Sequence, residues 1–402
     1  MAQYYVYTQI KSNVDSALLY YEMQAHRTGR DGTKLVVLDT GIQPLQSDYK
    51  TQRHETIDTT ESKSALFILE IMLYRKLGEQ FIPLLSKQES SIYSLGQFSS
   101  DKVINANSKE NIVYMETTQK TKEAKDGETN TYTLKISTKE RVFIAPEHPI
   151  GDGLDPFSWE NIMDQLEKRV RRKTLPNQDR TSLCGPAAFF YCLLKDRPDL
   201  YKQMAIELWE TGNAKLGALS IKPSHNCRRP KGIFNERGQL NVSGLDWITL
   251  ASLRDSENSI FDYQSVDDQF SGITLWSGLE SWFTKTGYKK VFDNISLSNC
   301  SIQDILDLNK YNDGSHHIVT LISAGMLLQT EGDTSFKNHW VVWEGKPTLL
   351  GDEELSKMTN IDACIDLRLF SWGEVHDYLK PNITLKEFLK HTFGGMVFKI
   401  IN

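Results

Sequence analysis

The chain has 402 residues, enough for two to three domains of ordinary size and for a sizeable apolar core. Its 46 Lys and Arg against 52 Asp and Glu give a formal net charge of −6, which disfavours a nucleic-acid partner because phosphate contacts need a basic surface. Aromatic residues make up 10% of the chain, too many for a disordered protein. The five cysteines form no C-x-x-C pair, so we expect neither a zinc site nor a disulfide framework, and a reducing compartment is favoured.

The N-terminal residues contain no basic segment followed by an apolar one, so a secretory signal peptide is not expected. The longest apolar run, Ala65–Tyr74, is short and contains Glu70, which disfavours a membrane span. We therefore predict a soluble protein, cytoplasmic in the cell that makes it, with no membrane partner. Export would need a route without a cleaved signal peptide.

Residues 1–150 are predicted to form a separate small α+β domain, whose role the sequence does not indicate. Two short strands are expected at Tyr4–Thr8 and Lys34–Leu38, and a helix at Asn13–Ala25 between them. A second, buried helix is expected at Ser62–Leu77, where Gly78 would end it.

Further along, the alternation of apolar and polar residues over Thr131–Ser137 predicts a half-buried strand. Its partner strand would be Ile112–Thr117, and the polar segment Thr121–Thr129 would be the loop that joins them.

A domain boundary is expected at Pro146–Pro156, which is rich in proline and glycine. Asp155 is then predicted to cap a helix that has Pro156 in its first turn. The basic segment Lys168–Lys173 would lie at the C-terminus of this helix, where a solvated basic face interacts favourably with the helix dipole.

Residues 155–402 are predicted to form a second domain in which helices precede strands, an order that favours an α+β fold over a doubly wound sheet. The expected helices are Cys184–Lys195, Asp199–Glu210, Asp246–Arg254, Ser277–Thr286 and Ile302–Leu308. The expected strands are Ile318–Ser323, Trp340–Glu344, Ile365–Ser371 and Met396–Ile401.

Cys184 begins a helix that is apolar on nearly every face, so the helix is expected to be central and buried. The free N–H groups and the positive dipole end of a helix N-terminus stabilise a thiolate and lower the pKa of a cysteine placed there. The alternative is a small apolar residue in the core, because free cysteine is among the most buried residue types. Gln178 lies six residues before Cys184, and its amide with the backbone N–H of Cys184 could form an oxyanion hole.

A cysteine nucleophile needs a base, and His339 is the favoured histidine because it opens the predicted strand that follows a polar loop, Thr334–Asn338. Neighbouring His316 and His317 would point to opposite faces of a strand, so a shared metal site is not expected, and neither a metal nor a cofactor is predicted. Five other histidines lie in polar surroundings and are expected at the surface: His26, His54, His148, His376 and His391.

Together these motifs resemble the papain-fold cysteine peptidases. The run Cys-Gly-Pro-Ala-Ala at Cys184 is most similar to the bacteriocin-processing branch, and Ser371-Trp372-Gly373 resembles the end of the papain strand Asn-Ser-Trp-Gly. The resemblance covers roughly residues 155–402 and implies a central buried helix packed on an antiparallel sheet. It also implies Cys184 as nucleophile, His339 as base and Gln178 as oxyanion donor.

The third catalytic residue departs from the family pattern, because Phe370 stands where papain has asparagine. Ser371 is favoured by its position at the end of a hairpin strand opposite His339. Asp366 is favoured by its charge, since a carboxylate stabilises an imidazolium. Both residues, and a Cys–His dyad without a third member, stay open at this point.

The leading interpretation is an enzyme, a cysteine hydrolase that acts as a peptidase on a protein or peptide substrate. A transglutaminase, a deamidase and a peptidoglycan amidase use the same constellation, and a catalytically inactive binding module on this fold is the non-enzymatic alternative. The unmatched N-terminal domain and the lack of a signal are similar to bacterial papain-like effector toxins. Such a toxin would require a cognate immunity protein as a partner.

Overall fold

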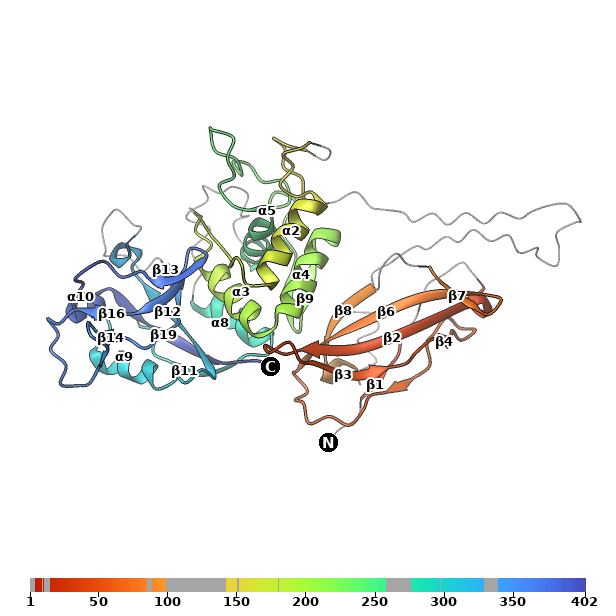
Figure 1. Cartoon of the computed structure of the whole chain (residues 1–402), viewed down its shortest axis with the longest axis horizontal. Helices are drawn as coiled ribbons and strands as arrows, with labels where there is room; N and C mark the ends of the chain where they lie inside the picture. The colour runs from red at the N-terminus through yellow and green to blue at the C-terminus, as the bar shows by residue number, and fades with distance from the viewer. Residues whose placement is uncertain are drawn as a thin grey trace, which may run out of the picture. The chain divides into compact units, whose positions relative to one another are not determined.

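The computed structural model describes residues 4–8, 10, 15–84, 89–98, 142–149, 152–179, 181–257, 276–296, 298–328 and 339–402. The chain divides into two compact units, Met1–Glu140 and Arg141–Asn402. The described chain combines helices, which lie mainly in the second unit, with antiparallel sheets, and this confirms the predicted α+β class for the chain as a whole. Figure 1 shows the first unit in red to orange and the second in yellow to blue.

The described part of the first unit is built mainly from strands. The strand order of its main sheet is β3-β2-β6-β7, with β4 also paired to β2 and β8 to β6, and β1 pairs with β5. The elements are β1 (Tyr5–Val6), a 3-10 turn (Ser16–Leu18), β2 (Leu19–Thr28), β3 (Lys34–Asp39), β4 (Gln43–Pro44), β5 (His54–Glu55), β6 (Leu66–Leu77), β7 (Gln80–Pro83), β8 (Glu89–Ser94) and α1 (Leu95–Phe98).

Two helices predicted in this unit are wrong, because both segments are strands. In β2, alternate residues Leu19, Tyr21 and Met23 are buried while those between them are half-buried, a period of two that belongs to a strand. β6 is a mainly apolar strand that pairs with β2 on one side and with β7 and β8 on the other. An apolar segment of this kind is compatible with either a buried helix or a strand, and here pairing with neighbouring strands decides in favour of the strand.

The expected strands at Lys34–Leu38 and Tyr4–Thr8 correspond to β3 and to the shorter β1. The predicted strands Ile112–Thr117 and Thr131–Ser137 and the loop Thr121–Thr129 lie outside the described residues.

The five helices predicted from Cys184 onwards are found with end residues shifted by at most three positions, although the one predicted at Asp246–Arg254 is divided into three segments. The described helices of the second unit are α2 (Trp159–Val170), α3 (Cys184–Asp196), α4 (Pro198–Thr211), α5 (Gly244–Asp246), α6 (Ser252–Glu257), α8 (Trp276–Lys285), α9 (Ile302–Asn309) and α10 (Leu385–Lys390). A π-helical stretch, Trp247–Ala251, joins α5 to α6.

A six-stranded antiparallel sheet has the order β11-β19-β12-β13-β17-β18. Its strands are β11 (Lys289–Asp293), β12 (His316–Ile322), β13 (His339–Trp343), β17 (Arg368–Ser371), β18 (Glu374–Asp377) and β19 (Thr392–Lys399). A smaller sheet contains β14 (Thr348–Leu349), β15 (Glu353–Glu354) and β16 (Ile365–Asp366), and β9 (Ala214–Leu216) forms a hairpin with β10 (Leu219–Ile221).

Helix α3 packs against strands β13 and β17 and also contacts α4 and α8. Tyr191 of α3 stacks on Phe370 of β17, with ring centroids 3.8 Å apart, and Phe283 of α8 stacks on Phe398 of β19. Alternate sheet residues, such as Val341 and Val397, belong to a second cluster with residues of α9 and α10. In Figure 1 the helices α2–α5 gather beside one face of the unit's sheet, with α3 adjacent to its strands.

Three details of the second unit differ from the predictions. Helix α2 is capped by Ser158, whose hydroxyl accepts from the N–H of Asn161, and not by Asp155. Arg169 was expected on a solvated face but is only 4% exposed. The strand predicted at Ile365–Ser371 is interrupted at Leu367, so that β16 and β17 belong to different sheets.

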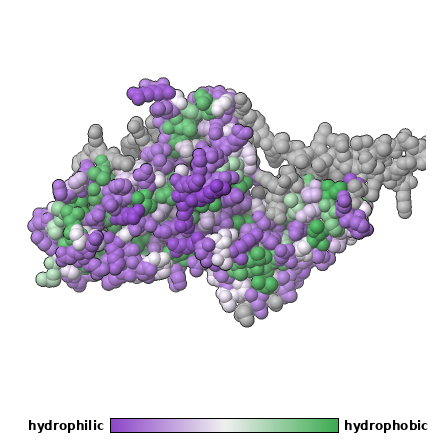
Figure 2. Space-filling view, viewed as in Figure 1, coloured by the Kyte–Doolittle hydropathy of each residue, from purple (hydrophilic) through white to green (hydrophobic). Residues whose placement is uncertain are grey.

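The face of the molecule drawn in Figure 2 is mostly polar. Figure 2 shows hydrophilic residues over most of the drawn face, with smaller hydrophobic areas between them. Exposed large apolar side chains include Leu350 and Met358, in the segment between β14 and β16. Among the described residues, no helix is long and apolar enough to cross a bilayer.

Candidate active site

Cys184 is the first residue of α3 and is 5% exposed. The helix begins here because Pro186 fits a first turn, where its missing N–H leaves no hydrogen bond unmade. Twelve of its thirteen residues are buried, so packing on all sides fixes the position of the thiol. No side chain caps this end, and the backbone N–H groups of Cys184 and Gly185 hydrogen-bond to the thiol itself.

The electrostatics of the thiol differ from the prediction. Burial raises the pKa of Cys184, although hydrogen bonds from the backbone of Trp340, Gly185 and Cys184 itself and the charge of Arg254 lower it. The expected lowering of the pKa was therefore wrong, because loss of solvation outweighs the helix terminus. The contact with Trp340 places the thiol beside the start of β13, whose first residue is His339.

His339 is 4% exposed, and its Nε2 lies 2.7 Å from the hydroxyl oxygen of Ser371. Trp372 stacks on the imidazole with ring centroids 4.7 Å apart. Burial lowers the pKa of His339 from 6.5 to about 4, so the imidazole is neutral at neutral pH. When Nε2–H donates to Ser371, Nδ1 carries the lone pair that a general base needs.

Of the two candidates for the orienting residue, Ser371 is the one that is hydrogen-bonded to His339. Ser371 ends β17, and the hydroxyl of Tyr378 donates to its carbonyl oxygen at 3.1 Å. Asp366 lies in β16, in the three-stranded sheet, and its carboxylate accepts a hydrogen bond from the adjacent N–H of Leu367. The break in the strand at Leu367 separates Asp366 from the sheet that carries His339.

Gln178 lies in the loop between α2 and α3 and is 5% exposed. Its backbone carbonyl oxygen accepts hydrogen bonds from the backbone N–H and the side-chain hydroxyl of Thr181, at 2.9 and 2.6 Å. Its side-chain oxygen is buried and has no hydrogen-bond partner among the described residues. A buried polar atom without a partner is costly, but this atom is an acceptor. The group that an oxyanion would need is the amide N–H at the other end of the same side chain.

The remaining histidines include two corrections. His26 and His391 were expected at the surface but are 7% and 8% exposed, and His26 lies 3.2 Å from Glu70. His317 is buried on β12 and lies 2.8 Å from the carboxylate of Asp196, the last residue of α3. Within the described ranges, no group of three or more His, Cys, Asp or Glu side chains is arranged to hold a metal ion.

Three contributors to the site were missed from the sequence. Trp372 covers the imidazole, Trp340 supplies a backbone group to the thiol, and Arg254 adds a positive charge to its surroundings. A signal existed for Trp372, since it lies in the motif Ser371-Trp372-Gly373. No signal existed for Arg254, because its relevance depends on how α6 packs in three dimensions.

Comparison with protein-family models, with curated proteins and with solved structures gives no match for this chain. What the site can do therefore follows from its own geometry.

The site combines a thiol at a helix N-terminus, a neutral imidazole held by a hydroxyl and stacked on by an indole, and a buried amide on the loop leading into the helix. A thiol can attack a carbonyl carbon, and a neutral imidazole within its reach can take and return a proton. Backbone N–H donors at a helix N-terminus can stabilise the negative oxygen that forms in such a reaction.

Proposed function

We propose that the chain is a cysteine hydrolase, a peptidase in the simplest form, with Cys184 as nucleophile and His339 as base. The observation that carries the proposal is the hydrogen bond of 2.7 Å between His339 and Ser371, on the strand whose next residue, Trp340, contacts the thiol. A hydrolase needs a nucleophile, a base and a group that orients the base, and these three residues supply them.

In the proposed reaction, the sulfur of Cys184 attacks the carbonyl carbon of the substrate while the thiol proton passes to His339. The carbonyl oxygen becomes negatively charged and is stabilised by the amide of Gln178 and the backbone N–H of Cys184. The imidazolium then protonates the leaving amine, the C–N bond breaks and a thioester forms. A water molecule, deprotonated by His339, cleaves the thioester and restores the thiol.

The pKa directions bear on how this reaction starts. Burial raises the pKa of Cys184 and lowers that of His339, so the resting pair is a neutral thiol and a neutral imidazole. We propose that the proton moves as the sulfur attacks, rather than before the substrate binds. This differs from the resting thiolate that a helix N-terminus was expected to stabilise at Cys184.

The proposal is tested with p-nitrophenyl acetate, an activated ester that needs no knowledge of the natural substrate. We expect a release of p-nitrophenolate and the appearance of one acetyl group on Cys184, mapped by peptide mass spectrometry. Cys300→Ala serves as the matched control, because Cys300 is half-buried and lies outside the site. Acetylation spread evenly over the cysteines would remove the basis of the proposal.

The hydrolase classes are then separated with casein as substrate. A peptidase produces new N-termini, a transglutaminase incorporates dansylcadaverine, and a deamidase releases ammonia without cleaving the chain. These products differ because the thioester is formed from a different bond or resolved by a different acceptor.

A second candidate, a binding module without catalysis, is favoured by one observation. Cys184 and His339 are 5% and 4% exposed, so in this conformation neither is open to a large substrate. A module of this kind would bind peptides but would not be acetylated at Cys184, and the ester experiment therefore distinguishes it from the enzyme.

A further inference from the structure

A buried ion pair joins α2 to α5 at the base of the loop that carries Gln178. The guanidinium of Arg169 donates from Nη1 and Nη2 to the two carboxylate oxygens of Asp246, at 2.7 and 2.9 Å. Their side chains are 4% and 2% exposed. Burial disfavours the charged form of Arg169, but the adjacent carboxylate keeps its pKa above the ordinary value, so the arginine is charged.

Such a pair is weak evidence for stability, because the free-energy cost of removing two charges from water is about as large as the free energy gained from their attraction. Apolar residues of similar volume would fill this space at little cost or with a gain. The additional hydrogen bonds of Asp246 suggest what the pair does instead. Asp246 accepts from the backbone N–H of Asn177 at 3.2 Å and from the hydroxyl of Ser243 at 2.8 Å.

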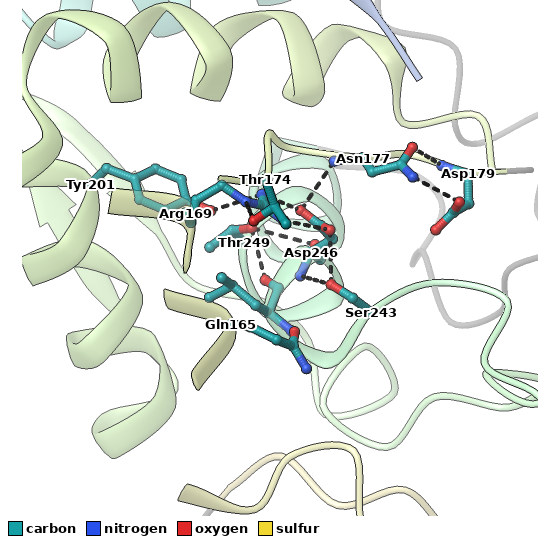
Figure 3. Close-up of polar contacts among 10 residues, drawn as sticks. Gln165, Arg169, Thr174, Asn177, Asp179, Tyr201, Ser243, Asp246 and Thr249 are labelled. Carbon is teal, nitrogen blue, oxygen red and sulfur yellow. Dashed lines mark hydrogen bonds and ion pairs between the residues drawn. The ribbon is translucent and has the colours of Figure 1, made fainter. Parts of the chain in front are cut away.

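The bond to Asn177 ties the ion pair to the residue immediately before Gln178. In Figure 3, Asp246 lies between the side chain of Arg169 and the turn formed by Asn177 and Asp179. Two hydrogen bonds join the residues of this turn. The side-chain amide of Asn177 donates to the carboxylate of Asp179 at 2.8 Å, and the backbone N–H of Asp179 donates to the side-chain oxygen of Asn177 at 2.9 Å. Arg169 also donates to Thr174 at 3.3 Å, so the loop is held at its start as well.

Asn177 is in addition packed against the hairpin that follows Ser371. A Cβ placed on Gly373 would lie 2.7 Å from the Cβ of Asn177, and Gly373 has a φ of +77°. Only glycine permits both the close approach and the backbone conformation. Asn177 is thus fixed between the buried ion pair on one side and the turn carrying Ser371 and Trp372 on the other.

We infer that Arg169 and Asp246 are positioning residues, which hold the loop 174–179 so that the Gln178 amide faces the oxyanion. The inference rests on the proposed function, because it concerns the reaction that Cys184 would catalyse. The pair acts through Asn177 and has no direct contact with the reacting atoms.

The experiment compares two reactions of the same thiol. Acylation by p-nitrophenyl acetate passes through an oxyanion, whereas alkylation by iodoacetamide displaces iodide without forming one. In Asp246→Asn we expect the maximal acylation rate to fall by about 10²-fold, the effect of displacing a catalytic group by roughly an ångström. The alkylation rate of Cys184 and the half-saturating ester concentration should stay at the wild-type values.

Asp246→Asn leaves a buried arginine without its charged partner and can lower stability. The double variant Arg169→Met/Asp246→Leu removes both charges and is expected to fold with wild-type thermal stability. It should show the same selective loss of acylation, because the acceptor for the Asn177 N–H is gone. Asp199→Asn is the matched control: it weakens a second pair, with Arg197 at 2.9 Å, at the start of α4. We expect wild-type acylation from it.

The outcomes separate the two proposals. A wild-type protein that is not acetylated at Cys184 ends the proposed function, whatever the variants do. Acetylation of the wild type with an unchanged rate in the folded double variant ends the positioning role and leaves the hydrolase intact. Equal losses of acylation and alkylation would show that the pair supports the whole site and not the oxyanion loop, which also contradicts the inference.

Discussion

Two buried histidines lie on neighbouring strands of one sheet, near opposite ends of the same helix. His339 on β13 has a hydroxyl partner, Ser371, near Cys184 at the start of α3. His317 on β12 has a carboxylate partner, Asp196, at the end of α3. The helix thus has the proposed nucleophile and base at one end and an aspartate–histidine pair at the other.

The difference shows that residue type alone is a poor guide to a catalytic histidine. A carboxylate stabilises an imidazolium better than a hydroxyl does, so chemistry alone favours a histidine paired with an aspartate. In this chain the thiol near that pair is Cys192, whose pKa burial raises well above its ordinary value. The pair itself is buried, and Asp196 also accepts from the N–H of Ile401 near the chain's last residues. We assign it a structural role, and we assign the proton transfer to His339.

The largest expected effect comes from removing the two reactive groups. Cys184→Ala and His339→Ala should each lower acylation by p-nitrophenyl acetate by at least about 10⁴-fold, as for other members of nucleophile–base pairs. His317→Gln is the matched control and should keep most of the wild-type rate per folded molecule. A comparable loss in the His317 variant would abolish the distinction between the two ends of the helix.

The second effect concerns stability at the other end of the helix. Asp196→Ala should lower the free energy of unfolding by about 1–3 kcal/mol, because it leaves a ring nitrogen of His317 buried without its hydrogen-bond partner. Urea denaturation measures this, with Asp307→Ala as the control. Asp307 belongs to a surface pair with Lys310, and its loss should cost less than about 1 kcal/mol. The folded Asp196 variant should still be acetylated at Cys184; an inactive but folded variant would contradict the structural role.

The third effect is a dependence of stability on pH that comes from His339. Its pKa is about 4 in the folded protein against 6.5 for an ordinary histidine, so between these values the unfolded chain binds a proton that the folded one does not. The contribution of His339 to the free energy of unfolding should therefore be fully present above about pH 6.5. It should be lost, by up to about 3 kcal/mol, as pH drops to 4.

Denaturation of the wild type and of His339→Gln over this pH range measures the contribution. The variant lacks the titrating group, so its curve should be flatter by the same amount. Parallel curves would mean that the pKa of His339 is not depressed in the folded protein.

The smallest expected effect is that of the orienting hydroxyl. Ser371→Ala removes one neutral hydrogen bond, worth about 1 kcal/mol, and should lower the acylation rate by about five- to tenfold. Asp366→Asn is the control and should leave the rate unchanged, because Asp366 belongs to another sheet. A larger loss from the Asp366 variant would reverse the assignment of the third residue.

Much of the second unit could be predicted from local patterns. The buried helix that begins at Cys184 and the strand that begins at His339 follow from apolar runs and their flanking residues, and the structure has them at these positions. The first unit was harder, because the apolar segments that form β2 and β6 suit a helix as well as a strand. Pairing between β2 and β6, more than forty residues apart, made them strands.

The site was predictable as a set of residue types but not as a set of contacts. The order Gln178, Cys184, His339 and Ser371 is visible in the sequence, whereas the choice between Ser371 and Asp366 depended on the break at Leu367. Arg169 was predicted at the surface because basic residues surround it, and its burial follows from a carboxylate far along the chain, Asp246.

The sequence by itself determined the α+β class, the helix that presents Cys184 and the candidates for its chemistry, because these depend on residues close together in the chain. Tertiary structure decided the partner of His339, the direction of the pKa shift of Cys184 and the ion pair that anchors the Gln178 loop. These three depend on which distant groups meet and on how completely water is excluded around them, and a linear pattern carries neither kind of information.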